Sequence, residues 1–165
     1  MPPDGWANSV VVSSSRCCGH EVDDTPEDRR CMRIAYSCCM ESDLEVAINE
    51  RHASVSDGNL QRSARAVGDP IVVLGPKGAG RITPAQFAEW VERSGIKLIP
   101  RSWHPISDRL MVVEEDATWP ESKAPTRVAT VFRVCGGKVT AALRLPDLKS
   151  ALELAYICRE MAASE

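Results

Sequence analysis

The chain has 165 residues, of which 44% are hydrophobic and 26% are charged, and these proportions are typical of a globular protein with room for one domain. Its formal net charge is −3, which argues against a non-specific nucleic-acid-binding protein, because such a protein needs a basic face to neutralise phosphates. No stretch approaches the roughly 18 apolar residues of a membrane span, and no secretory signal is visible. We therefore expect a cytoplasmic protein with no nucleic-acid or membrane partner.

Residues 1–42 differ in composition from the rest of the chain. They hold seven acidic residues and four arginines, which accounts for the whole net charge, and they lack helical or strand periodicity. We predict a poorly ordered, cysteine-rich acidic extension over residues 1–42 and a folded domain over residues 43–165.

Five of the seven cysteines lie in this extension. They are Cys17, Cys18, Cys31, Cys38 and Cys39. Structural zinc sites use paired ligands two to four residues apart on both sides of a loop. The cysteines do not follow that spacing, even with His20 added, so we expect free thiols and no metal.

The domain begins with two predicted helices. The apolar residues with helical spacing in the first are Leu44, Ala47, Ile48 and Val55. This pattern predicts a helix over residues 43–56 with Asp43 as its N-cap. Asp57-Gly58 ends that helix, and a second helix is expected over residues 60–67.

A glycine-rich segment separates the first predicted strand, 71–74, from the next helix. A phosphate-binding loop needs a lysine at a helix start followed by serine or threonine. Lys77 instead lies inside the segment 75–80, so we predict a hairpin or connecting turn and no bound nucleotide. A capping box over residues 83–86 begins the next helix, and Gly95 ends it.

Four further strands and a last helix are predicted in the second half. The strands are expected over residues 96–103, 109–119, 127–135 and 138–145, and the helix from residue 147. Gly136-Gly137 indicates a hairpin between the last two strands. Long strands joined by hairpins predict an antiparallel sheet, and the fold class is α+β, with helices on one face of a curved sheet.

Four blocks of sequence carry a family resemblance. They are Asp57-Gly58-Asn59-Leu60, residues 72–78, the strand pair over residues 128–139, and Arg144-Leu145-Pro146-Asp147-Leu148. Their order and spacing over residues 43–160 resemble the nuclear transport factor 2-like superfamily, closest to its SnoaL-like polyketide cyclase branch. The resemblance implies a cone-shaped half-barrel of curved antiparallel sheet, N-terminal helices over the concave face, and a C-terminal helix. It implies no single function, since members of the family isomerise, dehydrate, cyclise or only bind.

The resemblance also allows one family chemistry to be compared position by position. The ketosteroid isomerase branch places its base, its tyrosine and its protonated acid where this chain has Leu74, Arg51 and Thr130. None of these three residues can take those roles. We therefore do not expect an isomerase of that mechanism.

Glu115 interrupts an apolar face of the predicted strand 109–119. Alternate residues of a strand share a face, and the other members of this face are Met111, Val113, Ala117 and Trp119. We predict that this face points inward. A carboxylate there has a raised pKa unless it is paired, and such groups are functional candidates. The alternative is that Glu115 only pairs with a neighbouring arginine.

Arg144 is the arginine that the resemblance places on the concave side, whereas it places Arg133 outside. A lone buried charge is costly, so we predict a Glu115–Arg144 pair at the floor of the pocket. The pair would polarise a ligand, act as a catalytic acid and base, or brace the barrel.

The resemblance places Thr130 and Phe132 on the concave side as well. His52 neighbours the family's tyrosine position, so we include it among the residues that reach the pocket, whereas His104 in a proline turn is expected at the surface. The remaining candidates for the pocket lining are Trp90, Trp103 and Trp119. An apolar pocket with a few polar groups is the usual small-molecule site, and we expect a small-molecule ligand and no cofactor.

Two hypotheses of function follow. The first is a SnoaL-like pocket protein that binds a small apolar or cyclic metabolite, with cofactor-free acid/base chemistry of the isomerase, lyase or hydrolase type. The second is a non-catalytic ligand-binding or dimerisation module of the same fold, which the missing isomerase residues favour. The resemblance implies a homodimer under both.

Overall fold

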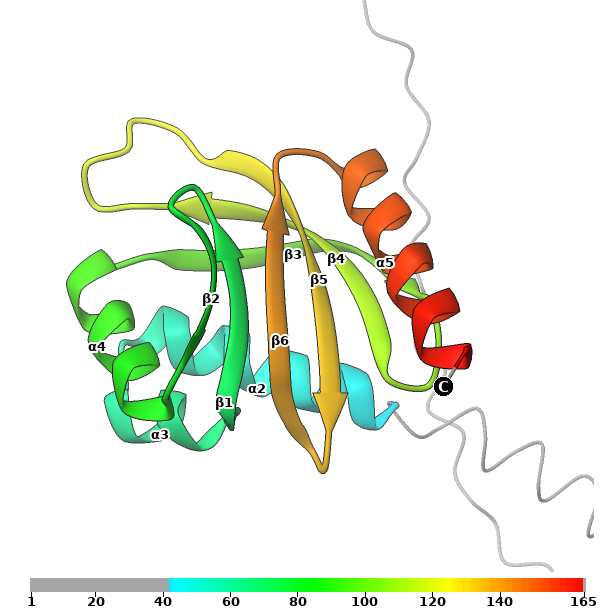
Figure 1. The fold of residues 1–165 in the computed structure, drawn as a ribbon. Helices are drawn as coiled ribbons and strands as arrows, with labels where there is room; N and C mark the ends of the chain where they lie inside the picture. Colours follow the sequence, from blue (N-terminus) through cyan, green and yellow to red (C-terminus); the bar gives the residue numbers. More distant parts are fainter. Residues whose placement is uncertain (1–41, 165) are drawn as a thin grey trace, which may run out of the picture. The chain divides into compact units, whose positions relative to one another are not determined.

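The computed structural model describes residues 42–164 (Figure 1). The predicted extension over residues 1–42 lies outside the described residues except for Ser42. The helices are α2 (Asp43–Asp57), α3 (Leu60–Arg65), α4 (Pro84–Ser94) and α5 (Leu148–Ala163). The strands are β1 (Val67–Gly75), β2 (Gly78–Ile82), β3 (Lys97–Pro105), β4 (Leu110–Thr118), β5 (Thr126–Cys135) and β6 (Lys138–Leu145). None of the described helices is long and apolar enough to cross a membrane.

Helix α2 begins one residue earlier than the sequence suggested. Its N-cap is Ser42, whose side chain accepts a hydrogen bond from the amide of Glu45, so the prediction of Asp43 as the cap was wrong. A serine hydroxyl satisfies the free amides of a first turn as well as a carboxylate does. Asp43 instead places a negative charge at the positive end of the helix dipole.

The glycine-rich segment forms the turn of a hairpin between β1 and β2, which is one of the two alternatives expected for it, but strand β2 itself was not predicted. Ile71 pairs with Ile82 and Gly75 with Gly78, so the second half of the glycine-rich segment is a strand. Glycine has low β-propensity, which hides β2 in the sequence. Helix α3 is correspondingly shorter than expected, because its chain enters β1 at Val67.

The six strands form one curved, open sheet in the order β2-β1-β6-β5-β4-β3 (Figure 1). The pairs β3–β4, β4–β5 and β5–β6 are antiparallel, as predicted. The pair β1–β6 is parallel, which the expectation of an antiparallel sheet did not include. The α+β fold class is otherwise as the sequence indicated.

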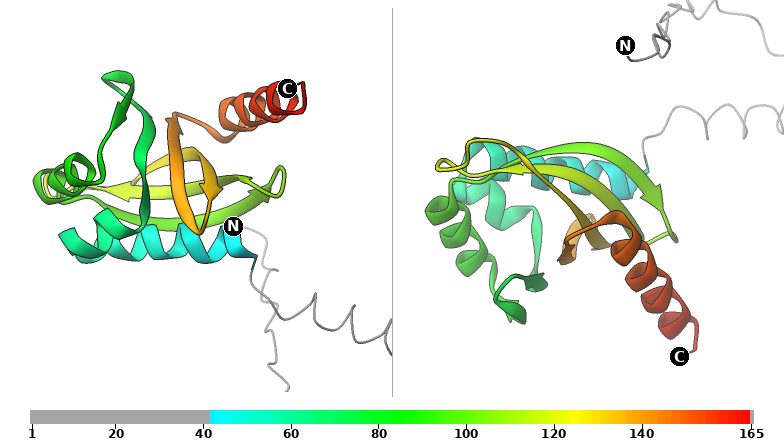
Figure 2. Two further views of the ribbon diagram at one scale, coloured as in Figure 1. Left: turned by 60° about the horizontal axis from the view of Figure 1, so that its bottom comes forward. Right: turned by 90° about the horizontal axis from the view of Figure 1, so that it is seen from above.

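Two hydrophobic cores lie on opposite faces of the sheet. Helix α2 packs against β3, β5 and β6 on one face, and α5 packs against β4, β5 and β6 on the other (Figure 2). We call these the concave and convex faces. The concave core contains Ile48, Val55, Met111, Val113 and Phe132, and the convex core contains Leu110, Val112, Val131, Ala151 and Ala155. The alternation along β4 therefore places Met111, Val113 and Glu115 on the concave face.

Candidate functional site

A row of four residues crosses the concave face at its middle. Trp103 of β3 pairs with Val113 of β4, Val113 pairs with Thr130 of β5, and Thr130 pairs with Arg144 of β6. Residues paired directly across a sheet point to the same side. The sheet register therefore gathers an aromatic ring, a hydroxyl and a guanidinium on one line.

Glu115 is the charged centre of this face. Its side chain is only 1% exposed, although it lies on a strand of otherwise apolar inward residues. Its Oε1 accepts a hydrogen bond of 2.6 Å from Thr130 Oγ1, and its Oε2 is bonded to Nε2 of His52. Both carboxylate oxygens are thus satisfied by side chains from two other elements.

His52 is held at both ring nitrogens. Its Nδ1 lies 2.8 Å from the carbonyl oxygen of Ile48, one turn earlier in α2. Because a carbonyl oxygen can only accept, Nδ1 carries a hydrogen, and one further proton lies between Nε2 and Glu115. Wherever that proton resides, His52 and Glu115 together carry no net charge.

The pKa of Glu115 reflects two opposing effects. Burial raises the pKa. It is lowered by the hydrogen bond and charge of His52, by the charge of Arg51 and by the hydrogen bond from Thr130. The lowering effects are larger in sum, so the pKa lies below its ordinary value. Hydrogen bonds and positive charges favour the ionised form. The surroundings of Glu115 therefore favour its ionised form.

Arg51 is the site residue that sequence reasoning missed. It is 3% exposed, and its guanidinium carbon lies 5.0 Å from the ring centre of Phe132 and 5.4 Å from that of Phe87. Its Nε and Nη1 are buried without a hydrogen-bond partner among the described residues. Burial, only partly opposed by the charge of Glu115, lowers the pKa of Arg51 to about 10, so it stays charged at neutral pH.

The signal for Arg51 was present in the helix pattern. Arg51 follows Ile48 by three residues and precedes Val55 by four, so it belongs to the apolar stripe of α2. The resemblance had also aligned it with the tyrosine of the isomerase branch. An arginine inside an apolar stripe of a helix is the same kind of signal as Glu115 on the apolar face of its strand.

Arg144 lies at the other side of the cluster. Its guanidinium carbon is 5.9 Å from the ring centre of Trp119, and its Nε is buried without a hydrogen-bond partner in the described chain. Burial lowers the pKa of Arg144, and the charge of Glu115 raises it. The two residues feel each other's charge, but the direct Glu115–Arg144 pair expected from the sequence is absent between residues 42 and 164, because His52 and Thr130 occupy the carboxylate.

Aromatic rings surround these polar groups. Phe132 is fully buried and lies 5.5 Å from His52 between ring centres, and Trp103 lies 6.3 Å from His52. Trp90 stacks on Phe87 with 5.8 Å between the ring centres. Trp90, Trp103 and Trp119 are all partly buried against the concave core. We refer to Arg51, His52, Glu115, Thr130 and Arg144 as the interior polar cluster.

No protein-family model and no curated protein matches the sequence. Solved structures match the fold. An NTF2-like protein of unknown function from Cytophaga hutchinsonii superposes with a TM-score of 0.58 at 10% identity, over 69% of this chain and 98% of that one. The Delta 5-3-ketosteroid isomerase from Mycobacterium sp. gives 0.54 at 18% identity, over 66% and 96% of the two chains. RV0760c from Mycobacterium tuberculosis, in complex with estradiol-17beta-hemisuccinate, gives 0.56 at 13% identity, over 66% and 97%.

The chain has the nuclear transport factor 2-like fold. The resemblance that the sequence blocks carried is thereby confirmed at the level of the fold. Identities of 10 to 18% say nothing further about chemistry, because one fold hosts many functions. Function has to be argued from the interior polar cluster.

In this nuclear transport factor 2-like fold, the two positions aligned earlier with the isomerase tyrosine and acid both lie in the cluster. Arg51 and Thr130 stand there, on α2 and β5. The third aligned position, Leu74 near the end of β1, is half-buried and apolar. Arg51 thus places a cation where the isomerase branch has the phenol of its tyrosine. Thr130 places a hydroxyl where that branch has its protonated acid.

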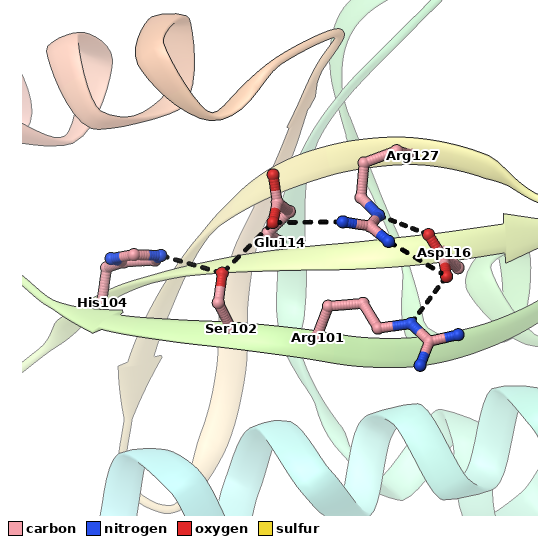
Figure 3. A network of polar contacts seen from close by, with 6 residues as sticks. All are labelled: Arg101, Ser102, His104, Glu114, Asp116 and Arg127. Atoms are coloured by element: carbon pink, nitrogen blue, oxygen red, sulfur yellow. Dashed lines mark hydrogen bonds and ion pairs between the residues drawn. The ribbon is translucent and has the colours of Figure 1, made fainter. Parts of the chain in front are cut away.

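A second polar network lies on the convex face of the nuclear transport factor 2-like sheet (Figure 3). Asp116 accepts hydrogen bonds from Arg101 and Arg127, and these bonds, that of Arg127 first, hold the pKa of Asp116 below its ordinary value. Arg127 also reaches Glu114 at 3.4 Å. Glu114 and Asp116 flank Glu115 in sequence and point to the opposite side of the sheet.

His104 lies away from the interior polar cluster. His104 is half-buried on the convex face, with its Nε2 2.9 Å from Ser102 Oγ (Figure 3).

A hollow of about 270 Å³ also lies away from the interior polar cluster. It is lined by Asp43, Leu44, Asp108, Arg109, Val134, Cys135, Gly136 and Gly137. None of the predicted site residues lines it. Residues 42–164 contain no group of three or more histidine, cysteine or acidic side chains that could hold a metal ion.

Proposed function

We propose that the concave face binds a small apolar, ring-containing molecule. The observation that carries this proposal is a set of polar groups buried among aromatic rings, with Glu115 and Thr130 hydrogen-bonded at the centre and Trp103 and Trp119 at the partly buried edge. A few fixed polar groups in an aromatic surround orient a ligand while apolar contact holds it. Fold neighbours support the proposal, since RV0760c has been solved with estradiol-17beta-hemisuccinate.

Ligand-observed NMR with 17β-estradiol and with 2-naphthol tests the proposal. We expect saturation transfer from the protein to at least one of these ring compounds, and loss of the signal in Trp103→Ala. Ile99→Ala is the matched control, because Ile99 is on the same strand, is 49% exposed and pairs with the convex Asp116. No transfer to either compound, or equal transfer in both variants, contradicts binding on the concave face.

A second candidate function is acid/base chemistry by the Glu115–His52 pair. The observation that favours it is the buried hydrogen bond between Glu115 Oε2 and His52 Nε2, beside the proposed ligand. Opposing it, both carboxylate oxygens and both ring nitrogens already have partners, which suits a structural brace equally. If the pair moves a proton to or from the ligand, Glu115→Gln shifts the pH profile of ligand binding. An unchanged pH profile would contradict proton transfer and support ligand binding without chemistry.

We further propose that two copies pair through the convex face. Helix α5 covers only part of this face, and the Arg101–Asp116–Arg127 network with the half-exposed Ile99 occupies another part. Light scattering after gel filtration should give the mass of a dimer, and Ile99→Lys should lower it. A monomeric mass at high concentration contradicts pairing.

A further inference from the structure

The interior polar cluster has an unequal balance of charge. His52 and Glu115 share one proton and carry no net charge together, as their hydrogen bonds require. Arg51 and Arg144 add two positive charges that no other side chain neutralises directly, since neither forms an ion pair within residues 42–164. Each arginine lies over an aromatic ring instead.

Two buried arginines without hydrogen-bond partners destabilise the protein unless a further group binds to them. A buried guanidinium has up to five N–H groups to satisfy, and a polar group buried without a hydrogen bond destabilises the protein. Arg51 leaves Nε and Nη1 without a partner, and Arg144 leaves Nε. The charge of Arg144 also disfavours the charged form of Arg51, because the two positive charges repel each other.

From this imbalance we infer that the ligand of the concave face carries a carboxylate, which is received by Arg51 and Arg144. The inference rests on the proposed function and names the ligand's chemical class. One anion would supply acceptors to the unpartnered nitrogens and reduce the repulsion between the two arginines. Guanidinium groups bind such anions by parallel hydrogen bonds.

The position of the arginines also orients the ligand. Arg144 lies opposite Thr130 in the sheet, and Trp103 lies at the far end of the same row. Thr130 donates its hydroxyl to Glu115 and is not free to bind an anion. The anionic group is therefore held beside Arg51 and Arg144, and the apolar rings extend along the row toward Trp103.

Two nearly isosteric probes test the inference, 2-naphthoate and the neutral 2-naphthamide. Binding to the wild-type domain is measured by titration calorimetry at low and at high ionic strength. Charge-assisted hydrogen bonds contribute enough that we expect 2-naphthoate to bind at least about tenfold more tightly than 2-naphthamide. The difference should shrink only partly with salt, because buried charges are screened weakly.

Three variants locate the anion. Arg51→Met and Arg144→Met should each remove most of the preference for 2-naphthoate while keeping the binding of 2-naphthamide. Arg133→Met is the matched control, because Arg133 is on β5 next to Phe132 but is exposed, and it should change neither. If Arg51→Met does not fold, Arg144→Met and the wild-type comparison still decide.

The outcomes separate the inference from the proposed function. Equal affinities for the two probes in the wild-type protein overturn the anionic ligand and leave ring binding intact. A preference for 2-naphthoate that persists in both arginine variants, or that disappears in Arg133→Met, also overturns it. Binding of neither probe contradicts the proposed function and the inference together.

Discussion

Glu115 and His52 are 63 residues apart in the chain and form a buried hydrogen bond that joins β4 to α2. Ile48 occupies the other ring nitrogen of His52, and Thr130 occupies the other oxygen of Glu115. The bond is therefore the central member of a chain of contacts that runs from the helix backbone to β5. Removing either partner leaves a buried group without its counterpart.

The first prediction concerns the coupling of this pair. His52→Leu leaves the buried carboxylate of Glu115 without its main partner and should lower the free energy of unfolding by about 3 kcal/mol or more. The double variant His52→Leu/Glu115→Met removes both partners and should lose less stability than the sum of the losses in His52→Leu and in Glu115→Met. Urea unfolding measures all three. Additive losses would contradict the coupling.

A control for this cycle is an ion pair at the surface. Arg62 forms exposed pairs with Glu50 and Asp57, and exposed pairs contribute little because water and salt screen them. Arg62→Ala should therefore have a distinctly smaller effect on urea unfolding than His52→Leu.

The second prediction is a loss of stability in acid. The pKa of Glu115 in the folded protein is below its ordinary value of 4.5, so the folded state binds this proton less readily than the unfolded state. The stabilisation by Glu115 is present above about pH 4.5 and is lost as the pH falls through the folded pKa.

Urea unfolding between pH 5 and pH 3 measures this effect. The stability difference between the wild-type protein and Glu115→Gln should shrink as the pH falls, while that between the wild-type protein and the exposed Glu89→Gln should stay small throughout. A wild-type advantage over Glu115→Gln that grows toward pH 3 would show the opposite sign and refute the prediction.

The third prediction concerns the hydroxyl of Thr130. Thr130→Val keeps the shape of the side chain but removes the 2.6 Å hydrogen bond to Glu115. Because a hydrogen bond to a charged group contributes about 1.5–3 kcal/mol, the variant should be destabilised by that order. The pKa of Glu115 should rise, which is measurable by carboxyl carbon NMR. Thr140→Val, whose hydroxyl makes an exposed 3.3 Å bond to Arg133, should move neither quantity.

The fourth prediction separates two glycines that end helices in the left-handed conformation. Gly58 has φ 65° and Gly95 has φ 55°, so alanine at either position costs about 1–2 kcal/mol. A Cβ at Gly95 would lie 2.7 Å from Cγ of Pro120, whereas one at Gly58 meets nothing within 4 Å. Gly95→Ala should therefore lower the melting temperature clearly more than Gly58→Ala. Equal shifts would mean that the Pro120 ring yields without cost.

The sequence predicted the part of this site that depends on alternation within one strand. Residues 110–118 form a regular strand, so counting by twos from Met111 placed Glu115 among apolar neighbours. It did not predict the partner of Glu115, because pairing between a helix and a strand depends on how far α2 is rotated over the sheet. That rotation is fixed by packing of residues such as Ile48 and Phe132, which no local pattern encodes.

The remaining differences have similar physical causes. Strand β2 was missed because Gly78 and Gly80 favour a turn, and only pairing with β1 makes the segment extended. Arg51 was missed because charged residues are expected on the exposed side of a helix. Its aliphatic stem and planar head instead fit between the rings of Phe87 and Phe132.

The parallel pairing of β1 with β6 has a consequence for the order in which the protein forms. Strand β6 is the link between the β1–β2 hairpin and the strands β5, β4 and β3, yet it is the last strand to leave the ribosome. Because β1 meets β5, β4 and β3 only through β6, the hairpin can join those strands only after β6 has been synthesised. Arg144 belongs to β6, so one segment of the chain supplies both the attachment of the hairpin and a residue of the interior polar cluster.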